Sequence, residues 1–151
     1  MPLLFRENIW RVDLQLNRNI LFLFGDNEAR YGLGGQAREC RGEPNAVGVR
    51  TKKKPSRDND AYWSDNKYDK YVEMIDEDFK RAFDHILAGG TVVCPMAKLG
   101  SGMSELPTRA PKLYRYIEYK ISELGRLGNM IREVDTEISD RYLAQKGILK
   151  T

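Results

Sequence analysis

The sequence is poor in the residues that build metal and nucleophilic sites. Its 151 residues include one histidine, His85, and two cysteines, Cys40 and Cys94, which are far apart. This set lacks the Cys/His spacing of a structural zinc site. We expect His85 to be structural, which leaves no Ser-His-Asp or Cys-His catalytic arrangement. The prediction is therefore no metal, no cofactor, and two buried free thiols in a reducing compartment.

The sequence also lacks a long hydrophobic run and a strong excess of either charge. No run of about 18 apolar residues is present, and the start MPLLFRENIW does not resemble a signal peptide. We expect a cytoplasmic protein without a membrane partner. The net charge is +3, from 25 basic and 22 acidic residues, which is too mild to favour nucleic acid. Two interpretations remain for the basic cluster at Lys52–Lys54 and Arg57: a solvated loop, or the anion-attracting rim of a cleft.

No internal repeat is found, and the length fits one domain over residues 1–151. Short apolar runs bounded by turn residues predict buried strands over 19–25, 46–50 and 91–95. Residues 3–14 predict an edge element, with Trp10 and Val12 alternating with charged neighbours. A final strand is expected at Met130–Val134.

Helices are predicted from apolar residues that recur every three or four positions. Two amphipathic helices are expected over 67–88 and 108–124, the second with Thr108 as N-cap. Shorter helices are expected at 36–40 and 136–146, and residues 51–66 are expected to form a long surface loop. Strands that alternate with loops and helices predict the α/β class.

Two glycine-rich loops carry the chemistry, because each directly follows a predicted buried strand. The first is GDNEARYGLGGQA, from Gly25 to Ala37, and the second is KLGSGMS, from Lys98 to Ser104. In α/β folds ligands bind outside the carboxyl ends of the strands. Bare amides in such loops can bind phosphate, although the spacing matches neither a Walker A motif nor GxGxxG. Tight turns that merely require glycine are the alternative interpretation.

Other polar and aromatic residues have two interpretations. Asp26 and Asn27 could form a turn, or could recognise a base or ribose through their carboxylate and carboxamide. Tyr62 and Trp63 could belong to the core or stack on a base. The acidic stretch Glu73–Asp78 is expected to form the solvated face of its helix.

Three segments resemble macro-domain-like proteins of the small phage or bacterial type. NILFLFGDNEARYGLGGQA and TVVCPMAKLGSGMSELPTRAPKLYRYI resemble the two ligand segments of that family, and RGEPNAVGVRTKK resembles the intervening strand. Together they cover roughly residues 19–124. The resemblance implies a three-layer α/β/α sandwich with a mostly parallel mixed sheet that binds ADP-ribose or a related nucleotide.

The resemblance also implies positions for ligand-binding residues. Asn27 falls where the family has an Asn near the distal ribose, and Asp26 is the candidate for the acidic residue that reads adenine. The diphosphate would lie on the two loops, against Gly32, Gly34, Gly35 and Gln36 of the first and Gly100, Ser101, Gly102 and Met103 of the second. Gly25 and Lys98, where the loops begin, complete the predicted ligand-binding set.

Three functions follow as hypotheses. The first is an ADP-ribosyl hydrolase, in which Asp26 or Asn27 orients a water that attacks the anomeric carbon. The second is a non-catalytic protein that sequesters a nucleotide second messenger such as a cyclic ADP-ribose isomer, as in phage counter-defence. The third is a nucleic-acid-binding accessory protein that uses Lys52–Lys54, Arg57 and the basic C-terminus. An oligomer is compatible with all three.

Overall fold

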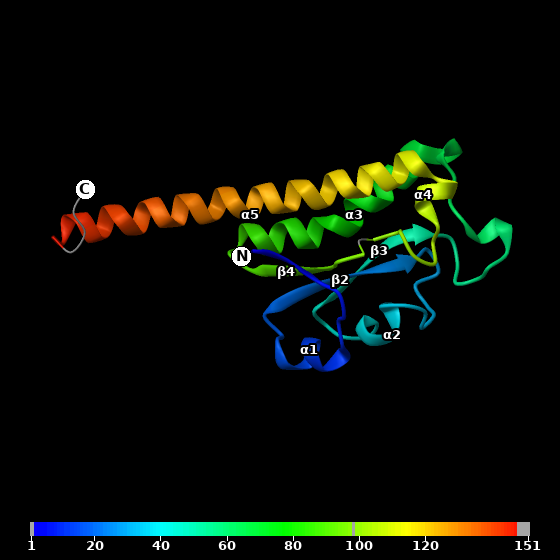
Figure 1. The fold of residues 1–151 in the computed structure, drawn as a ribbon, viewed down its shortest axis with the longest axis horizontal. Coiled ribbons are helices and arrows are strands. Elements are labelled where there is room, and N and C mark those ends of the chain that lie inside the picture. Colours follow the sequence, from blue (N-terminus) through cyan, green and yellow to red (C-terminus); the bar gives the residue numbers. More distant parts are fainter. Residues whose placement is uncertain (1, 98, 148–151) are drawn as a thin grey trace.

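The computed structural model describes residues 2–97 and 99–147 and confirms the α/β class (Figure 1). Its four described strands form one sheet in the order β1-β4-β2-β3, and all neighbouring strands are parallel. The strands are β1 (Leu3–Arg6), β2 (Ile20–Asn27), β3 (Ala46–Lys52) and β4 (Thr91–Pro95). Among the described strands the sheet is therefore fully parallel rather than mixed.

Helices cover both faces of this sheet, in keeping with a three-layer arrangement (Figure 1). The short helices α1 (Arg11–Leu16) and α2 (Ala37–Cys40) lie on one face. The long helices α3 (Tyr68–Leu87) and α5 (Pro111–Gln145) lie side by side on the other, with the short α4 (Leu106–Arg109) before α5. The loop after β3 contains two short 3-10 helices, η1 (Asn59–Ala61) and η2 (Asp65–Lys67).

The apolar residues of β2 explain this layering. Successive side chains of a strand point to opposite faces of a sheet. Leu21 and Leu23 accordingly pack into the core beneath α3 and α5, whereas Phe22 and Phe24 pack into a second core beneath α1 and α2. A strand that is buried on both faces needs the continuous apolar run by which it was predicted.

The strand order creates a crevice between β2 and β4. The chain leaves β2 toward α2 on one face and leaves β4 toward α5 on the other. Pairing between the two strands runs from Ile20–Thr91 to Phe22–Val93, whereas β2 stays paired with β3 as far as Asn27. Such a divergence is the topological switch point at which α/β sheets bind ligands.

The C-terminal third differs from the prediction. Met130–Val134 is not a strand, and residues 136–146 do not form a separate helix, because α5 continues without a break to Gln145. Its glycines serve close packing rather than termination. A Cβ on Gly128 would lie 2.7 Å from Cβ of Pro2, and one on Gly125 would lie 3.5 Å from Leu3. The long helix thus keeps its glycines where the N-terminal strand crosses it.

Two further boundaries were predicted wrongly. The edge strand ends at Arg6, so Trp10 is the N-cap of α1 and Val12 lies inside that helix. Thr108 lies within α4, and α5 begins at Pro111 with Ala110 as its N-cap. Both short helices have too few residues to show a periodic hydrophobic pattern in the sequence.

The remaining expectations concern the two cysteines, His85 and the absence of a membrane-spanning helix. Cys40 and Cys94 are both buried, as predicted, and neither forms a disulfide bond within the described residues. Burial raises the pKa of Cys40 to about 12. His85 lies on α3 with its Nε2 3.0 Å from the carbonyl oxygen of Asn19. Within residues 2–97 and 99–147, no helix combines the length and the apolar character needed to cross a membrane.

Candidate functional site

A cleft of about 760 Å³ lies at the carboxyl ends of the strands. Its size is within the usual range of small-molecule sites, ~300–1,000 Å³. It is lined by residues from the ends of β2 and β3 and from the loops after β2, β3 and β4, so that both glycine loops face one space. The predicted ligand-binding residues that line it are Gly25, Asp26, Asn27, Gly32, Gly34, Gly35, Gln36, Gly100, Gly102 and Met103.

Two predicted residues are not brought into the lining. Ser101 does not belong to the lining, and its hydroxyl donates a hydrogen bond to the carbonyl of Ala97. Lys98 lies outside the described residues. The second loop therefore faces the cleft through Leu99, Gly100, Gly102, Met103 and Ser104. The hydroxyl of Ser104 donates a hydrogen bond to the carbonyl of Gly100.

The two glycine loops touch each other and the loop after β3. A Cβ on Gly34 would lie 2.9 Å from Sδ of Met103, and one on Gly32 would lie 2.9 Å from Cβ of Pro55. Gly32 also has a φ of +106°, which side chains other than glycine rarely adopt. Glycine at these positions therefore permits the close approach of the three loops.

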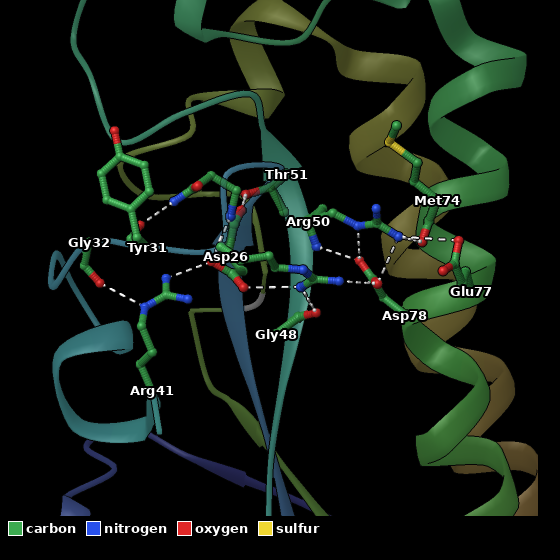
Figure 2. A network of polar contacts seen from close by, with 12 residues as sticks. Asp26, Tyr31, Gly32, Arg41, Gly48, Arg50, Thr51, Met74, Glu77 and Asp78 are labelled. Atoms are coloured by element: carbon green, nitrogen blue, oxygen red, sulfur yellow. Dashed lines mark hydrogen bonds and ion pairs between the residues drawn. The ribbon is translucent and has the colours of Figure 1, made fainter. Parts of the chain in front are cut away.

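The first loop is held to the strand end by an arginine that sequence reasoning missed. Arg41 follows α2 and donates from Nε to the carbonyl of Gly32 at 2.8 Å. Its Nη2 donates to Oδ1 of Asp26 at 2.6 Å (Figure 2). The same guanidinium thus connects the glycine loop to the floor of the cleft. The sequence places Arg41 directly after the predicted short helix, but it does not show where the side chain points.

Asp26 is a buried member of an ion-pair network. Arg30 donates from Nη1 to Oδ2 of Asp26 at 3.0 Å, and the backbone amide of Asn27 donates to Oδ1 at 2.8 Å. Burial opposes ionisation of this carboxyl, but the hydrogen bonds from Arg41, the Asn27 amide and Arg30 outweigh burial and lower its pKa. Asp26 is consequently a stable carboxylate with its oxygens already engaged. Strand β2 also extends past the predicted stop at Gly25, so that Asp26 and Asn27 end the strand.

The network continues across the sheet to α3. Arg30 also donates from Nη2 to Oδ1 of Asp78 at 2.7 Å, and Arg50 donates from Nε to Oδ2 of Asp78 at 2.9 Å (Figure 2). Asp78 is only 7% exposed, so the prediction that it belongs to the solvated face of its helix was wrong. Alternating charges thus connect the end of α2, β2, β3 and α3 beneath the cleft.

Two buried acceptors at the cleft have no partner. Asn27 donates from Nδ2 to the carbonyl of Tyr31 at 2.8 Å, which turns its Oδ1 away from that carbonyl. Within the described parts of the chain, neither Oδ1 of Asn27 nor Oε1 of Gln36 accepts a hydrogen bond. Buried polar atoms are almost always paired in folded proteins. Both of these amide oxygens belong to residues of the lining.

Basic and acidic residues both line the cleft. Arg41, Lys52, Arg57 and Glu105 belong to the lining, whereas Lys54 pairs with Asp60 at 3.3 Å outside it. Lys52 and Arg57 therefore fit the interpretation of the basic cluster as the rim of a cleft, whereas Lys54 fits the interpretation as a solvated loop. Burial lowers the pKa of Lys52, Arg109 and Arg57 lower it further, and Glu105 acts in the opposite direction.

Tyr62 and Trp63 have different environments. Tyr62 lines the cleft, with Nζ of Lys52 at 4.3 Å and Cζ of Arg109 at 3.7 Å from its ring centroid. Trp63 belongs to the core, where it stacks on Tyr71 at 4.1 Å and donates from Nε1 to Glu28. The Tyr62 ring thus contacts Lys52, which lines the cleft, and Arg109, which does not, and the tryptophan supports the loop from below.

No group of three or more His, Cys, Asp or Glu side chains is placed to hold a metal ion in the described parts of the chain. The arrangement instead offers carboxamide acceptors, ammonium and guanidinium donors, and exposed loop backbone. Such a set can bind an anionic ligand that also carries hydroxyl or amino groups.

Comparison with known proteins identifies a family. Residues 4–120 match the family described as "Family of unknown function (DUF7831)", a range that includes both glycine loops and the network beneath them. No curated protein and no solved structure matches the chain. Because this match spans well over half of the 151 residues, the chain belongs to family DUF7831, a family of unknown function.

Proposed function

We propose that this protein binds ADP-ribose or a related nucleotide in the cleft between its two glycine loops. The observation that carries the proposal is that one cleft contains basic side chains and two buried amide oxygens that accept no hydrogen bond within the described residues. Lys52 and Arg57 supply positive charge in the same cleft as the backbone of both glycine loops. Phosphate groups bind to such combinations of amides and cations.

The acceptors argue for a sugar in addition to phosphate. Oδ1 of Asn27 and Oε1 of Gln36 need donors, and the ionised diphosphate of a nucleotide such as ADP-ribose has none to give. Ribose hydroxyls and base amino groups are donors. A nucleotide or sugar nucleotide therefore satisfies both the basic residues and the amide oxygens of the cleft.

The state of Asp26 favours binding over hydrolysis. A general base must accept a proton from the attacking water. Both oxygens of Asp26 already accept hydrogen bonds, and two arginines hold its pKa low. We therefore favour the sequestering role over the hydrolase, with Asp26 as a positioning residue beneath the ligand.

Isothermal titration calorimetry with ADP-ribose tests the proposal. Gly102 is the site for a blocking variant, because its φ is ordinary and a Cβ there would meet nothing within 4 Å. We expect wild type to bind and Gly102→Glu to lose the heat, since the new carboxylate would fill the cleft and repel phosphate. Gln15→Glu on α1 is the matched control, with the same charge change at an exposed position far from the cleft.

The ligand recovered after incubation separates the two roles. Unchanged ADP-ribose by mass spectrometry supports sequestration, and a smaller product supports hydrolysis. Absence of heat with ADP-ribose, cyclic ADP-ribose and NAD would refute nucleotide binding. Binding to nucleic acid that weakens steeply with salt would support the accessory-protein alternative instead.

A further inference from the structure

The cleft contains an exposed carboxylate, that of Glu105. Among the described residues, the acidic side chains of the lining are Asp26 and Glu105. Asp26 is 5% exposed, and its oxygens already accept hydrogen bonds from Arg30 and Arg41. The side chain of Glu105 is 48% exposed, so its oxygens can still meet a ligand.

The backbone fixes Glu105 at the N-cap of α4, directly after the second glycine loop. Its amide donates to the carbonyl of Gly102 at 3.0 Å, and its carbonyl accepts from the amide of Arg109 at 2.9 Å. Its φ of +54° is in the left-handed region, which residues other than glycine rarely adopt. Both peptide groups are thus hydrogen-bonded, and they present the side chain to the cleft from a defined position.

Basic and hydroxyl groups surround the Glu105 carboxylate. Nε of Arg109 lies 3.4 Å from Oε1 of Glu105. Burial raises the pKa of Tyr62, and a hydrogen bond with Glu105 raises it further, which places the tyrosine hydroxyl beside the carboxylate. Glu105 is also close enough to Lys52 to oppose the lowering of the pKa of that lysine by burial. Lys52 and Arg109 therefore offset the negative charge of Glu105 where it meets the cleft.

Glu105 adds to the acceptors of the cleft that can take a donor from a ligand. Oδ1 of Asn27 and Oε1 of Gln36 accept no hydrogen bond within the described residues. Both residues belong to the lining, as Glu105 does. A carboxylate has two acceptor oxygens, so a pair of adjacent hydroxyls can donate to both at once. Among the groups of a nucleotide, the neighbouring hydroxyls of a ribose have this form.

We propose that Glu105 is the specificity-determining residue of the cleft, and that it accepts hydrogen bonds from two adjacent hydroxyls of a ribose. This role of Glu105 rests on the proposed nucleotide binding, and it specifies which part of the ligand is selected. Lys52 and Arg57 attract phosphate, whereas Glu105 repels a phosphate that brings no hydroxyl donors with it. The cleft thereby prefers a sugar phosphate to free phosphate or pyrophosphate.

Calorimetry with two ligands gives effects of opposite sign in one variant. For Glu105→Gln we expect the dissociation constant of ADP-ribose to rise about tenfold or more, because a charged acceptor of two hydrogen bonds is lost. The same variant should bind inorganic pyrophosphate more tightly than wild type does, because a repelling charge is lost. A merely structural role would weaken both ligands or neither, and either result overturns the proposal.

Two further variants separate the carboxylate from the fold. Glu105→Gly removes the side chain and suits the φ of +54°, so it should keep the backbone and reproduce both effects. Glu73→Gln is the matched control, because it removes the same charge at an exposed position on α3 outside the lining. The control should bind both ligands as wild type does. A Glu105→Gly variant that binds ADP-ribose as tightly as wild type overturns the proposal.

Competition between two sugar phosphates tests the hydroxyls directly. Ribose-5-phosphate should displace ADP-ribose from wild type at a lower concentration than 2-deoxyribose-5-phosphate, and Glu105→Gln should remove this difference. A wild type that does not distinguish the two sugars, or a variant that still does, overturns the proposal. A wild type that binds no nucleotide refutes the proposed function itself, whereas ADP-ribose binding that Glu105→Gln leaves unchanged refutes only the role of Glu105.

Discussion

At the scale of single residues, Asp26 is the residue on which the cleft depends most. It lies at the end of β2, is 5% exposed, and accepts hydrogen bonds from Arg30 and Arg41. Arg41 in turn holds the carbonyl of Gly32. Loss of the Asp26 charge would remove the carboxylate that pairs with Arg41 and one of the two carboxylates that pair with Arg30, and would loosen the hold of Arg41 on the first glycine loop.

We expect Asp26→Asn to lower the free energy of unfolding by about 2–3 kcal/mol at neutral pH, because the guanidinium groups of Arg30 and Arg41 lose a charged hydrogen-bond acceptor. The native pKa of Asp26 is below its ordinary value of 3.8. A carboxyl of this kind stabilises the fold above about pH 4, and its contribution is lost as pH falls through the native pKa. Wild type and Asp26→Asn should therefore converge in acid.

Urea unfolding between neutral and acid pH measures this difference. Asp84→Asn is the control, because Asp84 is exposed on α3, and changes at such surface positions usually stay within about 0.5 kcal/mol. An Asp26→Asn difference that stays constant down to the lowest pH would show that the carboxylate charge is not what stabilises the native state.

The sequence located Asp26 and Asn27 at the edge of the sheet but did not reveal the partners of Asp26. Position after a buried strand is a local property, and the strand run NILFLFG was enough to predict it. Asp78 is 48 residues from Arg30, with which it pairs, and its neighbours Glu73–Glu77 make it resemble a solvated helix face. Long-range ion pairs leave no periodic signal, so the network needed the structure.

At the scale of elements, the Asp26 side chain of β2 lies directly over Gly48 of the neighbouring strand β3. A Cβ on Gly48 would lie 2.4 Å from Oδ2 of Asp26, and Arg30 donates to the carbonyl of Gly48 at 2.7 Å (Figure 2). The φ of Gly48 is ordinary, so the glycine is required for space rather than for conformation. One methyl group would therefore push on the buried carboxylate.

We expect Gly48→Ala to destabilise the protein by about 1–3 kcal/mol, the usual cost of overpacking. Gly25→Ala is the matched control in the neighbouring strand, because a Cβ there would meet nothing within 4 Å. Thermal unfolding of the two variants compares them. Equal melting temperatures for the two would mean that β2 and β3 can separate enough to accept a methyl group.

Elements with strong periodicity were predicted well, and those with competing signals were not. Helix α3, predicted over 67–88, spans Tyr68–Leu87, and β4 spans Thr91–Pro95 as predicted. The prediction ended the second long helix at residue 124 and placed a strand at Met130–Val134, whereas α5 continues through Gly125 and Gly128, although glycine usually weakens a helix. Pro2 approaches Gly128 closely, a contact between residues 126 positions apart, so its structural reason is invisible to local sequence patterns.

At the scale of the whole molecule, the strand order explains why two loops distant in sequence make one cleft. Helices α2 and α5, which follow β2 and β4, lie on opposite faces, and the two strands separate beyond Phe22 and Val93. The glycine loops begin at these diverging ends and meet where Gly34 approaches Met103. A ligand between them would contact both at once.

Hydrogen–deuterium exchange with ADP-ribose tests this dependence of one loop on the other. We expect slower exchange in residues 25–37 and 99–104 together, because one ligand would order both, while α1 should exchange as before. Protection of a single glycine loop would mean that the ligand binds on one side of the crevice, and the switch point would then not be the site. Protection of both loops in Gly102→Glu would equally argue against the cleft, because that variant should be unable to hold the ligand.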